Sequence, residues 1–151
     1  LVWNCSGYES AEIIKLLDGI VDIYMPDVKY SHRNPADKYS NAPDYFERCT
    51  EALLEMHRQV GDLKLDAHGI AYRGLLIRHL ILPNNLAGSE QILRFIAHHL
   101  STNSYVNIMF QYRPEGRAYF YQELNRRPMR HECSQVVEYA VNLGLTRGLN
   151  I

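Results

Sequence analysis

The sequence predicts an α/β fold in which parallel strands alternate with crossover helices. Four apolar runs of strand length end in polar residues, within 1–8, 20–30, 74–85 and 105–114. The segments between them carry apolar residues at helical spacing. This alternation is typical of a parallel sheet with right-handed crossovers. Four such units amount to about half of a (β/α) barrel, or to a small open sheet.

The first two predicted strands flank a short helix. Ser6-Gly-Tyr-Glu9 has the form of a capping box, in which a serine and a glutamate bond the first backbone amides of a helix. The apolar helix face that follows ends at Gly19. The run in 20–30 then predicts a buried strand that stops at Pro26.

A long helix is predicted after the polar segment 31–43. Its apolar residues recur with the helical period and are Tyr45, Cys49, Ala52, Leu53, Met56 and Val60. Asn41 or Ser40 is expected to cap this helix, with Pro43 near its first turn. Residues 62–74 then predict a small hairpin before the third strand.

The second half of the chain continues the alternation of strand and helix. Ser89 is expected to cap the helix after the third strand. The fourth strand is predicted around 106–109, and an irregular stretch rich in tyrosine and arginine fills 111–127. A final apolar helix is expected to end at Gly144.

Composition limits the partners that suit this chain. Its 151 residues predict a single domain, 1–151, that can bury a core. The 16 lysines and arginines nearly balance the 17 aspartates and glutamates, so we expect neither nucleic acid nor an anionic membrane as a partner. No apolar stretch reaches the roughly 18 residues of a membrane span, and no signal peptide is recognisable. The sequence therefore predicts a cytoplasmic protein.

The three cysteines are predicted to be free structural thiols. Cys5, Cys49 and Cys133 are odd in number and far apart. That pattern fits neither a disulfide framework nor a clustered metal site.

Asp27 and Lys29 are the first candidate functional residues, because they follow a buried strand directly. The loops past the carboxyl ends of parallel strands form the binding face of α/β sheets. Arg78 and His79 lie within another apolar run, where alternation sends their side chains to opposite faces. We expect Arg78 to face the site. A rim ion pair with no further role is the alternative for Asp27 and Lys29.

Four ordered segments carry a family resemblance. They are Asn4-Cys-Ser-Gly-Tyr8, Met25-Pro-Asp-Val-Lys-Tyr30, Ile77-Arg-His-Leu-Ile-Leu-Pro83 and Gln111-Tyr-Arg-Pro114. Together they resemble the later strands of radical S-adenosylmethionine (SAM) proteins of the pyruvate formate-lyase activating enzyme-like group. The resemblance extends from Leu1 to about Arg147. It implies the carboxyl-terminal half of a partial, TIM-like (β/α) barrel.

The resemblance also implies an activity for a longer parent protein. Such an oxidoreductase cleaves SAM reductively at a [4Fe-4S] cluster and generates a radical on a substrate, such as a glycine of a glycyl radical enzyme. The family's Cys-x-x-x-Cys-x-x-Cys and Gly-Gly-Glu segments are absent from this sequence. Because the chain begins at Leu1 inside an apolar run, we expect the parent to have residues before it. The chain alone is expected to bind no cluster and to be inactive.

The resemblance assigns one side of the SAM site to this chain. The side chains that it places there are Asn4, Ser6, Asp27, Lys29, Arg78 and Gln111. Their chemistry is consistent with those roles: Lys29 can pair with a carboxylate, Asp27 can accept from ribose hydroxyls, and Arg78 offers a planar fork of donors. Asn4 stands where related enzymes often carry aspartate, so a cation site there is not expected.

Two other functions remain open from the sequence. Lys29 is suited to be the Schiff-base amine of a different (β/α) barrel enzyme if burial lowers its pKa, although Asp27 beside it favours the charged amine. Alternatively, a half barrel is suited to bind a protein through the tyrosine- and arginine-rich loop 111–127 without catalysis. Its exposed sheet edges then favour dimerisation.

Overall fold

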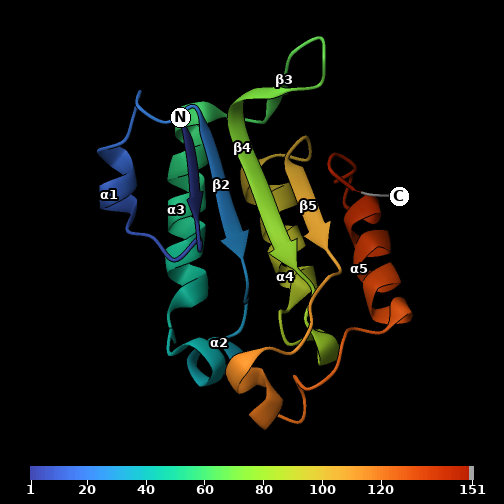
Figure 1. Cartoon of the computed structure of the whole chain (residues 1–151). Helices are drawn as coiled ribbons and strands as arrows, with labels where there is room; N and C mark the ends of the chain where they lie inside the picture. Colours follow the sequence, from blue (N-terminus) through green and yellow to red (C-terminus); the bar gives the residue numbers. More distant parts are fainter. Residues whose placement is uncertain (150–151) are drawn as a thin grey trace.

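Four parallel strands form the sheet of this protein (Figure 1). The structure is a computed structural model that describes residues 1–149. The parallel strands lie in the order β1 (Val2–Cys5), β2 (Ile23–Val28), β4 (Ala71–Leu80) and β5 (Tyr105–Met109). A short strand, β3 (Lys64–Leu65), pairs antiparallel with the beginning of β4. The predicted α/β fold with parallel strands is confirmed, and so is the hairpin before the third of them.

Helices occupy the connections between these strands. They are α1 (Ala11–Lys15), α2 (Arg33–Ser40), α3 (Tyr45–Val60), α4 (Ser89–Phe95) and α5 (Arg130–Asn142). A π-helical segment, η2 (Ile96–Leu100), continues α4, and the 3-10 turns η1 (Pro83–Asn85) and η3 (Gly116–Phe120) lie in the loops after β4 and β5. The predicted long helix is therefore confirmed as α3 and the final helix as α5.

The two faces of the sheet have different surroundings. One face packs against α3 and α4, which lie behind the sheet in Figure 1, and its buried apolar side chains are Tyr24, Val28, Leu75, Ile77, Val106 and Ile108. On the opposite face, Met25 and Leu76 are only half-buried, and no helix of residues 1–149 crosses in front of it. We call this second face the uncovered face. Parallel sheets are normally covered on both sides, so this face is a candidate surface for a ligand or for further protein segments.

The second strand does not stop at Pro26 as the sequence predicted. It continues to Val28, and Pro26 lies opposite Cys5 in the pairing with β1. Proline has no N–H to donate but its fixed φ is compatible with extended backbone. Asp27 is therefore the second-last residue of β2 and lies inside the sheet rather than in a loop.

The polar segment 31–43 contains a helix that the sequence did not predict. Helix α2 has a single fully buried residue, Ala36, and its polar composition gives no apolar period. Asn41 adopts the left-handed conformation, with φ of 51°, and ends α2. The prediction that Asn41 or Ser40 caps the long helix is wrong, because Asp44 precedes the first residue of α3.

Two predicted capping residues have other roles. Ser6 does not cap α1, which begins five residues later at Ala11 after Ser10. Ser89 is the first residue of α4 rather than its cap, and Gly88 occupies the cap position. In both places the sequence contains a residue that commonly caps helices, but the backbone turns into the helix elsewhere.

We predict that Gly7→Ala strongly destabilises the fold. Gly7 has φ of 77°, and a Cβ there would lie 2.3 Å from the Asp27 carbonyl oxygen. The substitution therefore combines left-handed strain with a backbone clash, and we expect a loss of about 2–4 kcal/mol in the free energy of unfolding. Urea denaturation measures it.

Gly19→Ala is the matched control for this prediction. Gly19 has φ of 79° but a Cβ there would meet nothing within 4 Å, so only the left-handed strain of about 1 kcal/mol is expected. Equal losses in the two variants would contradict the close approach between the β1 loop and β2.

Candidate functional site

Four polar side chains form a connected cluster on the uncovered face, at the carboxyl ends of the strands. Arg78 donates from Nε to Asp27 Oδ1 at 2.7 Å and from Nη2 to Asn4 Oδ1 at 2.9 Å. Lys29 Nζ lies 3.7 Å from Asp27 Oδ2. The cluster thus joins β1, β2 and β4, and we call it the carboxyl-edge cluster.

Strand register and side-chain alternation bring these residues together. Asp27 and Arg78 are direct Cα partners in the pairing of β2 with β4, and Asn4 is the partner of Met25 in the pairing of β1 with β2. Because side chains alternate along a strand, the side chains of Met25, Asp27 and Lys29 project to the same face. The predicted separation of Arg78 from His79 is confirmed, since His79 is fully buried on the helix side.

The carboxyl-edge cluster contains more positive than negative charge. Two cations, Arg78 and Lys29, share the single carboxylate of Asp27. The side chains of Asp27 and Arg78 are 23% and 25% exposed, whereas that of Lys29 is 41% exposed. Partial burial strengthens these charge-assisted hydrogen bonds relative to bulk water. The arrangement is suited to a ligand with one anionic group that approaches Lys29 from solvent.

Tyr45 fixes the backbone beneath the cluster. Its hydroxyl, in the first turn of α3, lies 2.8 Å from both the Ser6 and the Asp27 carbonyl oxygens and accepts the Lys29 amide N–H at 3.0 Å. One hydroxyl has one proton, which these two carbonyls share. The side chain is 3% exposed, and burial raises the pKa of Tyr45 well above its ordinary value. Tyr45 is therefore a neutral structural hydrogen-bonding group.

The buried His79 binds the same strand end from the other side. Its Nδ1 lies 2.7 Å from the Val28 carbonyl oxygen and its Nε2 lies 2.8 Å from Ser89 Oγ. A carbonyl only accepts, so Nδ1 carries the proton and Nε2 accepts from the Ser89 hydroxyl. Burial lowers the pKa of His79 below its ordinary range, which keeps the ring neutral.

A small apolar cavity adjoins the carboxyl-edge cluster. It has a volume of about 150 Å³ and is lined by Lys29, Tyr30, Leu80, Leu82 and Tyr112. These residues come from the ends of β2 and β4 and the loop after β5. The position is suited to an apolar or aromatic part of a ligand whose charged part contacts the cluster.

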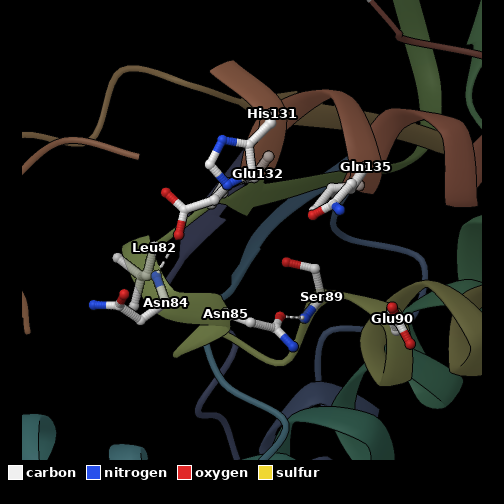
Figure 2. Close-up of a pocket in the computed structure, with 10 residues that line it drawn as sticks. Leu82, Asn84, Asn85, Ser89, Glu90, His131, Glu132 and Gln135 are labelled. Carbon is white, nitrogen blue, oxygen red and sulfur yellow. Dashed lines mark hydrogen bonds between the residues drawn. The ribbon is translucent and has the colours of Figure 1, made fainter. Parts of the chain in front are cut away.

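A larger cavity of about 270 Å³ lies between η1, α4 and α5 (Figure 2). Much of its polar lining is already engaged in internal contacts. Glu132 accepts from the Asn84 backbone N–H at 2.7 Å and pairs with Arg126, also at 2.7 Å. These bonds lower the pKa of Glu132 to about 2. The contacts join the loop after β4 to α5, and the cavity shares no residue of the carboxyl-edge cluster.

The structure brings four of the six predicted site residues together: Asn4, Asp27, Lys29 and Arg78. Ser6 lies beside them but is exposed, and its Oγ accepts a hydrogen bond from the Tyr8 amide at 3.4 Å. Gln111 is exposed in the loop after β5 and does not join the cluster. The strand before that loop, β5, places Asn107 opposite Arg78 instead.

Sequence reasoning missed Tyr45 and the site role of His79. Tyr45 was predicted only as one apolar position of a long helix, and no pattern distinguishes it from its neighbours. The Arg78-His79 pair gave a partial signal, because a histidine inside a buried run needs a hydrogen-bond partner.

No metal site is evident in the part of the chain that the structure describes. Residues 1–149 contain no group of three or more histidine, cysteine, aspartate or glutamate side chains that could hold a metal ion. Burial raises the pKa of Cys5 to about 11 and that of Cys49 to about 12, so both are protonated thiols at neutral pH. Within the same residues, every helix is too short or too polar to cross a membrane.

Comparison with known proteins adds one relative. The chain is 34% identical over 146 residues to "Uncharacterized protein MJ0674" of Methanocaldococcus jannaschii, a match that covers 96% of this chain but 39% of the relative. The chain therefore spans well under half of that protein. No family model and no solved structure matches the chain.

We predict that Tyr45→Phe destabilises the protein by about 1–3 kcal/mol. The substitution keeps the ring but leaves the Lys29 amide without its tyrosine partner, and buried polar groups without partners cost free energy in that range. Urea denaturation measures the change. Tyr8→Phe is the control, because Tyr8 stacks on Tyr45 but is 41% exposed, and its hydroxyl bonds only the partly exposed Asp44 among the described residues; we expect it to change stability by less than about 0.5 kcal/mol.

His79 predicts a specific pH dependence of stability. Its pKa is lowered in the folded protein, whereas the unfolded chain binds a proton near the ordinary value of about 6.5. The contribution is therefore complete above about pH 6.5 and is lost as pH falls, by up to about 1.4 kcal/mol per unit until the folded pKa is reached. His79→Asn lacks this titration, so the stability difference between wild type and variant should shrink from pH 7.5 to 5. A constant difference would contradict a neutral buried ring.

Proposed function

We propose that this chain is the carboxyl-terminal part of a radical SAM protein of the pyruvate formate-lyase activating enzyme-like group, and that it holds one side of SAM. The carboxyl-edge cluster carries this proposal. It lies on the uncovered face and joins the carboxyl ends of three strands, which is where α/β proteins bind their ligands. Four of the residues that the family resemblance assigns to SAM form it.

A partial (β/α) barrel is the finer architecture that we propose for the parent. In such a barrel the helices cover the outside and the uncovered face becomes the interior. The edge strand supports this assignment, since β1 pairs with β2 alone among the described residues. Exposed apolar side chains gather at the same edge, on α1 and in the turn after it, namely Leu1, Val2, Ile13, Leu16 and Ile20. An unprotected apolar edge is a surface that further strands and helices can cover.

The residues present fit the groups of SAM. Lys29 is the most exposed cation of the cluster and suits the methionine carboxylate, while the second carboxylate oxygen of Asp27 can accept from ribose hydroxyls. The apolar cavity beside Lys29 suits a flat aromatic group such as adenine. Arg78 holds Asp27 in place and is itself held by Asn4.

In the parent protein the iron-sulfur cluster would come from residues outside this chain. When bound, SAM and the cluster supply the radical that abstracts a hydrogen atom from a substrate. This chain contributes orientation and charge around the cofactor. A protein substrate, such as a glycyl radical enzyme, is supported by η3, where Tyr119 and Phe120 are 56% and 85% exposed.

A non-enzymatic docking module is the second candidate, supported by the same exposed aromatic residues of η3. The Schiff-base alternative gains no support, because Lys29 is 41% exposed and lies beside Asp27, without the apolar enclosure that activates such lysines.

We predict that the 151-residue protein binds SAM weakly and that Lys29→Gln weakens this binding at least about tenfold. Removal of a charge-assisted contact has an effect of that size. An NMR titration of amide signals with SAM measures it, with shifts expected around Asp27, Lys29 and Arg78. Lys64→Gln is the matched control, because Lys64 is an exposed lysine of β3, which pairs with the beginning of β4, away from the cluster.

Two outcomes would contradict the proposal. One is the absence of SAM-induced shifts at the carboxyl edge of the wild-type sheet. The other is a stoichiometric [4Fe-4S] spectrum with SAM cleavage after anaerobic reconstitution of the 151-residue protein, because the chain should lack the cluster ligands.

A further inference from the structure

Two consecutive peptide groups at the end of β2, from Asp27 to Lys29, are held by two buried side chains from different elements. The Tyr45 hydroxyl bonds the Asp27 carbonyl and the Lys29 amide, and His79 Nδ1 bonds the Val28 carbonyl between them. Tyr45 belongs to α3 and His79 to β4. The tripeptide that carries Asp27 and Lys29 is therefore fixed from both sides.

His79 itself has no freedom to turn. Its ring is fully buried, and Ser89, which is 1% exposed, donates to Nε2. This second bond selects the tautomer that has the proton on Nδ1, the one that can bond Val28. Ser89 thus acts on the strand end through His79.

The loop that leads into Ser89 and α4 is joined to the same strand end by further hydrogen bonds. The Ser31 amide donates to the Ala87 carbonyl at 2.9 Å and the Ser31 hydroxyl donates to the Gly88 carbonyl at 2.9 Å. A Cβ on Gly88 would lie 1.9 Å from the Ser31 hydroxyl, so only glycine permits this approach. The β2 loop and the loop before α4 form one connected unit.

The Ser89–His79 pair is not arranged as an activated nucleophile. A general base must return its proton to a leaving group in the site. His79 has no exposed surface and its other nitrogen is occupied by a main-chain carbonyl. The pair is suited to positioning and not to proton transfer.

We infer that His79, fixed by Ser89, is a positioning residue: by holding the Val28 carbonyl it sets the directions of Asp27 and Lys29, and thereby the geometry of the carboxyl-edge cluster. The peptide group between Val28 and Lys29 joins the end of β2 to Lys29. Rotation of its carbonyl turns the Lys29 side chain away from Asp27. Binding groups need to be held to within a fraction of an ångström, and the buried ring supplies that restraint.

Two substitutions separate this role from simple packing. His79→Leu fills the same space with an apolar side chain of similar size but removes both hydrogen bonds of the ring. His79→Asn keeps a donor near the position of Nδ1 and can still bond the Val28 carbonyl. If His79 only filled space, leucine would be the better replacement; if it positions the strand end, asparagine would be.

The first measurement needs no ligand. Solvent exchange of the Arg78 Nε–H, which bonds Asp27, is followed by NMR in the 151-residue protein. We expect it to be about tenfold faster in His79→Leu and close to wild type in His79→Asn. The Arg58 Nε–H, which bonds Glu55 at 2.9 Å on α3, is the internal control and should not change. Unchanged Arg78 exchange in a folded His79→Leu protein would overturn the inference.

The second measurement adds SAM and depends on the proposed function. SAM affinity should fall about tenfold in His79→Leu, the scale expected for a displaced binding group, and recover in His79→Asn. If wild type binds no SAM but Arg78 exchange still responds as predicted, the proposed ligand is wrong and the positioning role stands. If His79→Leu does not fold, Ser89→Ala decides the question: it removes the tautomer restraint, and unchanged Arg78 exchange and imidazole ¹⁵N shifts of His79 would overturn the inference.

Discussion

The pairing of β4 with strands on both sides is the constraint on which the rest of this structure depends. Arg78 lies opposite Asp27 of β2 and opposite Asn107 of β5 in one row across the sheet. Because side chains alternate, the same pairing that buries Ile77 and His79 under the helices directs Arg78 to the other face. A one-residue slip of β4 would exchange the two sets and remove both the core and the carboxyl-edge cluster.

The cluster combines local charge with a rigid support. Asp27 carries the only negative charge among its four members, and the two cations on it are held at different degrees of exposure. The backbone beneath is fixed by two neutral, buried hydrogen-bonding side chains, Tyr45 and His79. Burial raises the pKa of Tyr45 and lowers that of His79, which favours the neutral form of both. The charged groups are thus open to a ligand while the groups that orient them are closed to water, the arrangement that favours preorganised binding.

The sheet is covered on one side and open on the other, and this asymmetry connects the fold to the proposed function. Apolar residues at β1 and α1 are exposed at an edge, whereas the carboxyl end of the uncovered face carries charge. An interior of this kind is costly to bury without a polar ligand to satisfy it. It is consistent with a half barrel that encloses a charged cofactor when its other half is present.

The elements were predictable where they depend on apolar pattern. All four parallel strands and the helices α3 and α5 follow from runs and periods of apolar residues. Helix α2 was not predicted, because one buried alanine leaves no period to detect. Ser6 and Ser89 were mistaken for helix caps because their residue type favours that role, whereas the path of the chain gave Ser89 to His79.

The sequence by itself determined the class of the fold and the cluster residues Asp27, Lys29 and Arg78, because strand ends and alternation can be read from where apolar runs meet polar groups, whereas Asn4 was implied by the family resemblance. It also determined that Arg78 and His79 point to opposite faces, since alternation is a local property of extended backbone. Only the tertiary structure decided which groups hold the site in place. Tyr45 is 18 residues from Asp27 and His79 is 51 residues from Val28, and contacts at such separation arise from the packing of strands and helices, which no local pattern encodes.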